Sequence, residues 1–101
     1  MKTVLVIYTD RVGLSKTEVA RTKKYAFNTS SEFEIGDIIE SKNYDTNMMV
    51  VKVLESSFTY FNAATGELSN DFTSTAQWTI RELVIREDEE EVVYGRIVNR
   101  L

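Results

Sequence analysis

Basic and aromatic side chains lie close together in the first third of the chain. Residues 11–24 carry five cations and a single acid, Glu18, with aromatic residues on both sides. The cations are Arg11, Lys16, Arg21, Lys23 and Lys24, and the aromatic residues are Tyr8, Tyr25 and Phe27. Cations that contact phosphates beside rings that stack on bases are the components of single-stranded nucleic-acid binding. We therefore name residues 11–24 the basic ribbon and treat it as a candidate binding surface.

A structural explanation of the same residues competes with this one. Tyr25 and Phe27 could fill the core, while the cations keep an exposed ribbon hydrated. The whole chain has 12 basic and 16 acidic residues and a net charge of −4, and the acidic excess lies in its second half. Such a chain attracts phosphate weakly unless its basic and acidic surfaces lie on opposite faces.

The acidic excess is concentrated in residues 87–91, Glu-Asp-Glu-Glu-Glu. A calcium loop needs ligands spaced so that the backbone wraps the ion, usually with a glycine, so five consecutive acids do not predict a metal site. They are typical of a solvated hairpin tip that resists pairing with other strands. The alternative is contact with a basic partner surface, which includes the basic ribbon of a second copy.

The residue types used most often in catalysis are missing. The chain has no histidine and no cysteine, which excludes catalytic triads that use histidine and sites that use a thiolate. Two carboxylate pairs, Asp37 with Glu40 and Asp10 with Glu18, are formal candidates for acid–base work. Asp and Glu at such positions more commonly cap turns and solvate strand edges. We predict a protein that is not an enzyme and has no cofactor or metal.

A second group of aromatic residues follows residue 57. Alternation along a strand places Phe58 and Tyr60 on one face and Phe61 on the other. If one face fills the core, the other leaves Phe61 or the hydroxyl end of Tyr60 near solvent, which makes Tyr60 and Phe61 candidate contact residues. Complete burial is the alternative, because a domain this small needs its large side chains inside.

Hydrophobic patterns predict the elements of the first half. Residues 2–9 are rich in β-branched and aromatic residues without clean alternation, as expected for a strand buried on both faces. Residues 18–28 predict a strand whose mixed face requires a bulge or a change in packing. Gly36 permits a sharp turn into a strand that starts at Ile38 and pairs with residues 48–56.

The second half is predicted to consist of hairpins. Residues 57–72 have glycine at position 66, where a type I turn needs a left-handed residue, so we expect a positive φ there. Residues 74–83 fit either a strand showing Trp78 and Ile80 on one face or a short helix, and their dense β-branched residues favour the strand. Residues 83–99 predict a closing hairpin with the acidic run at its tip.

These elements predict one mainly β domain spanning residues 1–101. Six or seven short strands suggest a compact antiparallel barrel or sandwich. The lack of cysteine points to the cell interior, and the first apolar run is too short for a membrane span. We therefore expect a cytoplasmic protein without a membrane partner.

One pattern resembles a known class. The pair Tyr25-x-Phe27, a polar run and then Ile35-Gly36-Asp37-Ile38 resemble small SH3-like barrels of uncharacterised bacterial and phage proteins. The resemblance implies an SH3-like fold and a phage or mobile-element setting, and it defines no site residues. We predict a non-enzymatic interaction module that binds a protein partner or itself. The alternative is a single-stranded nucleic-acid binder that uses Arg21, Lys23 and Lys24.

Overall fold

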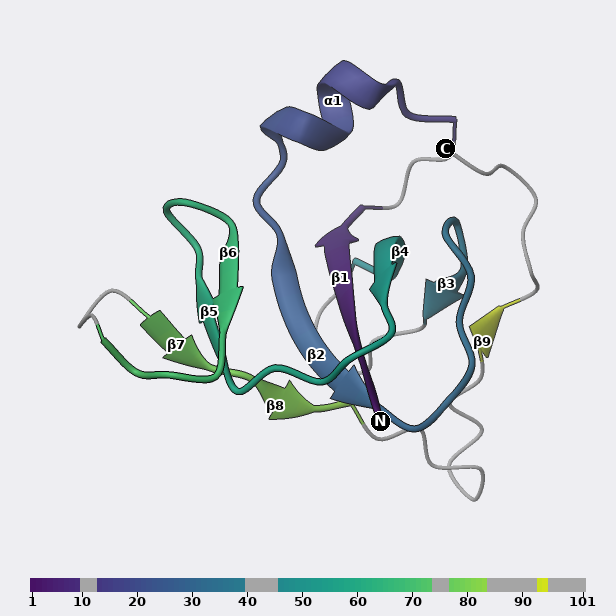
Figure 1. Cartoon of the computed structure of the whole chain (residues 1–101). Helices are drawn as coiled ribbons and strands as arrows, with labels where there is room; N and C mark the ends of the chain where they lie inside the picture. Colours follow the sequence, from purple (N-terminus) through teal and green to yellow (C-terminus); the bar gives the residue numbers. More distant parts are fainter. Residues whose placement is uncertain (10–12, 40–45, 74–76, 84–92, 95–101) are drawn as a thin grey trace.

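The computed structural model of the chain describes residues 1–9, 13–39, 46–73, 77–83 and 93–94. These residues form one helix, α1 (Lys16–Arg21), and nine strands. The strands are β1 (Lys2–Tyr8), β2 (Tyr25–Thr29), β3 (Ile38–Ile39), β4 (Met48–Leu54), β5 (Tyr60–Asn62), β6 (Glu67–Ser69), β7 (Gln77–Thr79), β8 (Arg81–Glu82) and β9 (Val93–Tyr94). They make a six-stranded sheet in the order β8-β2-β1-β4-β3-β9 and a three-stranded sheet in the order β6-β5-β7 (Figure 1). No helix in this part of the chain is long and apolar enough to cross a membrane.

Strand β1 lies at the centre of the large sheet and is buried on both faces, as its unbroken apolar run predicts. Val4 and Val6 point into one cluster, which also contains Phe33. Leu5 and Ile7 alternate to the other face and enter two separate clusters. The centre of the structure is therefore a strand with core on each side.

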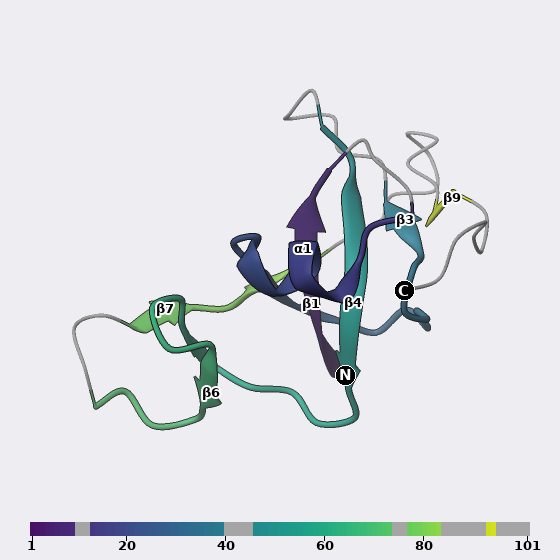
Figure 2. The same cartoon turned by 90° about the horizontal axis from the view of Figure 1, so that it is seen from above.

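The small sheet and α1 cover the second face of β1. Phe61 of the small sheet packs with Leu5 and Ile80, while Val19 of α1 packs against the cluster of Ile7, Leu14 and Met49. Figure 2 shows α1 in front of β1 and β4 and the small sheet to one side. The two sheets are thus joined through an apolar layer.

The predicted mainly β class is confirmed, and the details of its strands differ. All pairings in the described part of the chain are antiparallel except that of β2 with β8, which is parallel. Nine short strands replace the expected six or seven, because the segment after residue 76 divides between the two sheets. The pairings of the described strands do not close either sheet into a barrel.

The prediction of a continuous strand over residues 18–28 is wrong, because its first part is helical. Ser15 caps α1 by accepting a hydrogen bond from the Glu18 backbone N–H at 3.2 Å. Ser15 and Glu18 form the capping-box pattern, which favours a helix start over an extended strand. The helix ends at Arg21, and the side chain of the C-cap residue Thr22 donates to the Glu18 carbonyl at 2.7 Å. Only the portion from Tyr25 onward is a strand.

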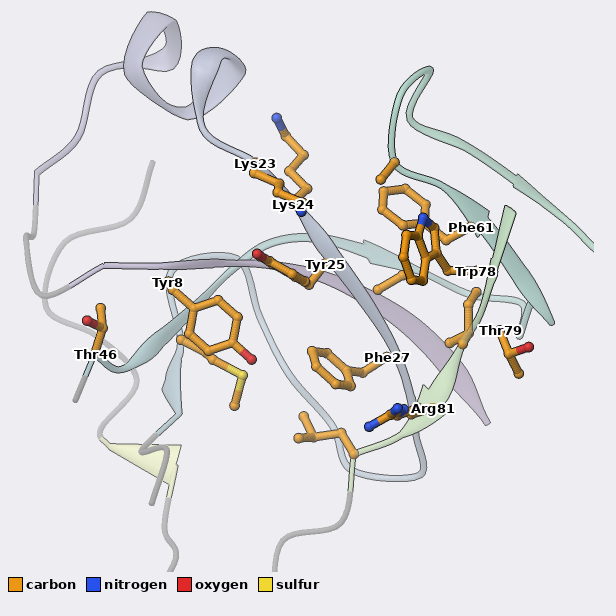
Figure 3. A pocket seen from close by; sticks show the side chains of 15 residues that line it. Tyr8, Lys23, Lys24, Tyr25, Phe27, Thr46, Phe61, Trp78, Thr79 and Arg81 are labelled. Atoms are coloured by element: carbon orange, nitrogen blue, oxygen red, sulfur yellow. The ribbon is translucent and has the colours of Figure 1, made fainter. Parts of the chain in front are cut away.

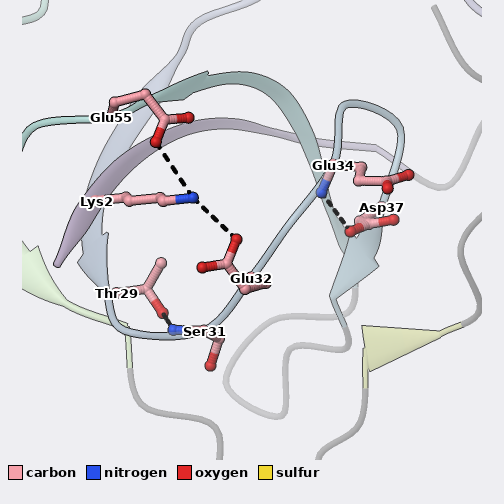
Figure 4. A network of polar contacts seen from close by, with 7 residues as sticks. All are labelled: Lys2, Thr29, Ser31, Glu32, Glu34, Asp37 and Glu55. Carbon is pink, nitrogen blue, oxygen red and sulfur yellow. Dashed lines mark hydrogen bonds and ion pairs between the residues drawn. The ribbon is translucent and has the colours of Figure 1, made fainter.

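Two predicted turns are confirmed. Gly36 has φ 94° and Gly66 has φ 76°, a region that glycine enters without a Cβ clash. Asp37 is 1% exposed, and its carboxylate accepts the Glu34 backbone N–H at 2.7 Å (Figure 4). In the second turn, the backbone N–H of Gly66 donates to the Asn62 carbonyl at 2.7 Å. These bonds fix the β3 entry and the β5–β6 hairpin.

Residues 74–83, whose sequence fits either a strand or a short helix, are extended where the structure describes them. Residues 77–79 form β7 and residues 81–82 form β8, which confirms the strand, while residues 74–76 lie outside the described part. Trp78 and Ile80 do not share an environment, because Trp78 is 68% exposed and Ile80 is 9% exposed. The predicted closing hairpin, residues 83–99, lies outside the described part of the chain except for residues 83 and 93–94. Residues 93–94 form β9, which pairs with β3.

Candidate ligand-binding groove

The chain forms a fork where β8 leaves β2. The two strands pair in parallel at Phe27 with Arg81 and at Asn28 with Glu82. One residue before Arg81, the Ile80 N–H donates to the Thr59 carbonyl at 2.8 Å. Strand β7, which precedes it, pairs with β5 of the small sheet. The start of β2 and the strand β7 therefore separate into different sheets.

A groove with a volume of about 640 Å³ occupies this fork (Figure 3). Its aromatic lining residues are Tyr8, Tyr25, Phe27, Phe61 and Trp78. Its charged lining residues are Lys23, Lys24 and Arg81. Among the described residues that line the groove, none is Asp or Glu. The groove therefore combines ring surfaces with positive charge.

The exposed aromatic surfaces of the groove come from two different sheets. Trp78 lies directly opposite Phe61 in the β5–β7 register, so both side chains are on the same face of the small sheet. Phe61 is 6% exposed and belongs to the core, whereas Trp78 lies at the edge strand and is largely exposed. Tyr25 of the large sheet is 37% exposed. Both rings line the same groove.

The ring of Tyr25 is held in place by its neighbours. The Tyr8 ring meets it edge to face, with centroids 5.0 Å apart and an interplanar angle of 81°. The Lys23 ammonium lies 5.3 Å from the Tyr25 ring centroid, within the range of a cation–π contact. Both contacts restrict the ring before any ligand binds, which lowers the entropy lost on binding.

The three cations of the groove have different local roles. Lys24 donates from Nζ to the carbonyls of Val19 at 2.9 Å and Thr22 at 3.3 Å, so it caps the C-terminal end of α1. Lys23 and Arg81 are exposed, and within the described residues neither forms an ion pair. The charge available to a ligand therefore comes mainly from these two.

The structure divides the predicted basic ribbon. Lys23 and Lys24 line the groove, as do Tyr8, Tyr25 and Phe27, which the sequence placed beside them. Lys16 and Arg21 lie on α1 and do not line it. Arg11 lies outside the described residues.

The second set of candidate residues is also divided. Tyr60 is half-buried and packs against Phe72, with ring centroids 5.1 Å apart. Phe61 is buried, so the alternative in which its side chain faces solvent is wrong. It lines the groove without being an exposed contact.

Two important groove residues were missed by the sequence analysis. Trp78 was placed on a strand face among the aromatic residues of the second half but was not a candidate binding residue, and Arg81 was not considered. In a strand the polar neighbours Gln77 and Thr79 face away from Trp78, so the local pattern predicts a buried ring and gives no signal of its exposure. Nothing local indicates that Arg81 lies beside Phe27, because their pairing joins segments more than fifty residues apart.

The other chemical candidates do not form a site in the described part of the chain. No group of three or more metal-ligating side chains gathers there. Asp37 is a buried turn residue, and its predicted partner Glu40 lies outside the described residues. Asp10 of the second predicted pair, Asp10 with Glu18, also lies outside them. The acidic run at residues 87–91 also lies outside.

No family model, curated protein or solved structure matches the chain. The resemblance to SH3-like barrels therefore stays a prediction, and function has to be argued from the groove itself.

Proposed function

We propose that the chain is a non-enzymatic, intracellular interaction module whose groove binds an acidic, extended segment of a partner protein. The observation that carries the proposal is the groove at the fork, where exposed rings lie beside cations and no described lining residue is acidic. Tyr and Trp present large, stiff contact surfaces and are enriched in protein interfaces. Lys23 and Arg81 add attraction for carboxylates.

The proposal also keeps the predicted relation to SH3-like barrels. Recognition of extended peptides along aromatic-lined grooves is one of the recurring modes of such small β domains. In this view the large and small sheets together form an open version of the barrel. The phage or mobile-element setting, drawn from the same resemblance, belongs to the proposal too.

The test is partner capture from the native host with matched charge variants. The variant K23E/R81E reverses both available groove cations, and K52E reverses an exposed lysine of β4 that does not line the groove. We expect wild type and K52E to retain the same partner protein and K23E/R81E to lose it at least tenfold. A partner retained equally by all three proteins would contradict the groove as the binding site.

Single-stranded nucleic acid is the second candidate, and the largely exposed ring of Trp78 in a groove with cations favours it. Bases could stack on Trp78 and Tyr25 while phosphates contact Lys23 and Arg81. Titration of a labelled oligothymidine at low salt separates the candidates. Binding that weakens with salt and is lost in K23E/R81E would assign the groove to nucleic acid. Absence of binding at low salt would eliminate this candidate.

A further inference from the structure

The fork leaves part of a strand edge without a partner strand. Strand β2 pairs with β1 through Tyr25 and Ala26, but β8 reaches only Phe27 and Asn28 on the opposite edge. Within the described residues, no strand lies beside Ala26 on that edge. Strand β7 likewise has β5 on one side and no described strand on the other.

The direction of the backbone groups follows from a hydrogen bond. The Asn28 carbonyl accepts the Leu83 N–H at 2.7 Å, so the backbone groups of Asn28 face β8. Residues two apart on a strand direct their N–H and C=O groups to the same edge. The Ala26 N–H therefore faces the fork, where β8 does not extend.

This edge lies beside the side chains that would recognise an acidic peptide. Tyr25 and Lys23 are its sequence neighbours, and Trp78 and Arg81 line the same groove. Backbone pairing supplies affinity in strand addition, and side chains supply specificity.

Resting on the proposed function, we propose that the partner segment binds as an added strand on the outer edge of β2, with its carboxylates toward Lys23 and Arg81. This mode explains why the cations and rings are gathered where a strand edge is open. Strand addition predicts that every second backbone N–H of the ligand donates a hydrogen bond to the strand edge, while the N–H groups between them do not.

The experiment titrates capped hexapeptides into the full chain and follows the fluorescence of Trp78, the single tryptophan. The probes are Val-Glu-Val-Glu-Val-Glu, its lysine counterpart, and two versions N-methylated at every valine or at every glutamate. We expect the glutamate peptide to bind at least tenfold tighter than the lysine peptide. N-methylation of one alternate set should weaken binding at least tenfold, and of the other set less than threefold.

Amide hydrogen exchange provides a second readout within the protein. With the glutamate peptide bound, exchange of the Ala26 amide should slow at least tenfold, while that of Asn28 should stay constant because Asn28 already faces β8. Equal weakening by both methylated sets, or an unchanged Ala26 amide, would overturn strand addition while leaving partner capture by the groove intact. Failure of the glutamate peptide to bind, or binding of oligothymidine in its place, would also overturn it. Loss of groove-dependent partner capture instead removes the proposed function.

Discussion

The groove and the N-terminal ion cluster, which consists of Lys2, Glu32 and Glu55, differ in how they surround their cations. In the ion cluster, Lys2 Nζ lies 2.9 Å from a Glu32 carboxylate oxygen and 3.3 Å from one of Glu55 (Figure 4). In the groove, Lys23 and Arg81 form no ion pair with a described carboxylate; Lys23 lies over the Tyr25 ring, and Arg81 lines the same groove. The ion cluster pairs its cation with carboxylates of the same chain. The groove leaves its cations without such a partner among the described residues, so that they are available to a ligand.

This difference shows where charge serves the fold and where it is available for recognition. The hydrogen bond that Lys2 donates to Glu32, and then the one that it donates to Glu55, raise the pKa of Lys2 above its usual value. The chain thus stabilises that positive charge with its own acids. The groove cations have no comparable partner in the described structure, so an external anion can form the ion pairs that the fold does not supply.

The largest expected effect is on the free energy of unfolding, at the buried carboxylate of Asp37 near the ion cluster. Asp37→Ala removes the buried acceptor of the Glu34 N–H and should lower the free energy of unfolding by about 2 kcal/mol. Asp37→Asn keeps an oxygen acceptor and should cost less. Urea unfolding of the two variants measures this. Equal stability of Asp37→Ala and wild type would show that the turn does not require the side chain.

The groove should show the reverse behaviour at Trp78. Because its side chain is 68% exposed, Trp78→Ala should change the free energy of unfolding by less than about 0.5 kcal/mol. It should weaken binding of the captured partner roughly tenfold, about 1.4 kcal/mol, because the exposed ring is a contact surface. The control is Thr65→Ala, in the exposed turn before Gly66, which should bind the partner as wild type does because Thr65 does not line the groove. Unchanged binding in Trp78→Ala would remove this ring from the interface.

Self-association is a further way to sharpen the comparison. If the acidic run at residues 87–91 of one copy meets the basic ribbon of another, sedimentation at low salt should show a dimer that dissociates in high salt. The variant R21E/K23E, which reverses two exposed cations of the basic ribbon, should then stay monomeric at both salt concentrations. A monomer at high protein concentration under all salt conditions would exclude this contact between copies.

The smallest effect is expected at Lys2, whose ion pairs are solvent-exposed. Its raised pKa means that the folded chain holds the proton more tightly than the unfolded chain. The contribution to stability is therefore full below about pH 10 and is lost as pH rises through the raised pKa. Lys2→Met should be slightly less stable than wild type at pH 8, and the difference should vanish at strongly alkaline pH. A difference that persists there would assign it to packing.

Much of the local structure could be predicted because its causes are local. The unbroken apolar run of β1 predicted burial on both faces, and glycine at positions 36 and 66 predicted two turns. The helix could have been predicted as well, from the capping pattern of Ser15 and Glu18. Alternation over residues 18–28 pointed to a strand, but the cap and the short-range bonds of α1 decided the conformation.

The groove depended on pairings that no local pattern contains. The sequence by itself determined that cations and aromatic rings lie beside each other at residues 23–27, since adjacency along the chain requires no fold. Only the tertiary structure brought Trp78 and Arg81 to them, because β8 pairs with β2 while β7 pairs with β5. That choice depends on contacts between distant segments, in which the Ile80 side chain joins the core with Leu5 and Phe61. The physical reason is that burial of apolar surface between the sheets, and not local propensity, sets where the chain divides.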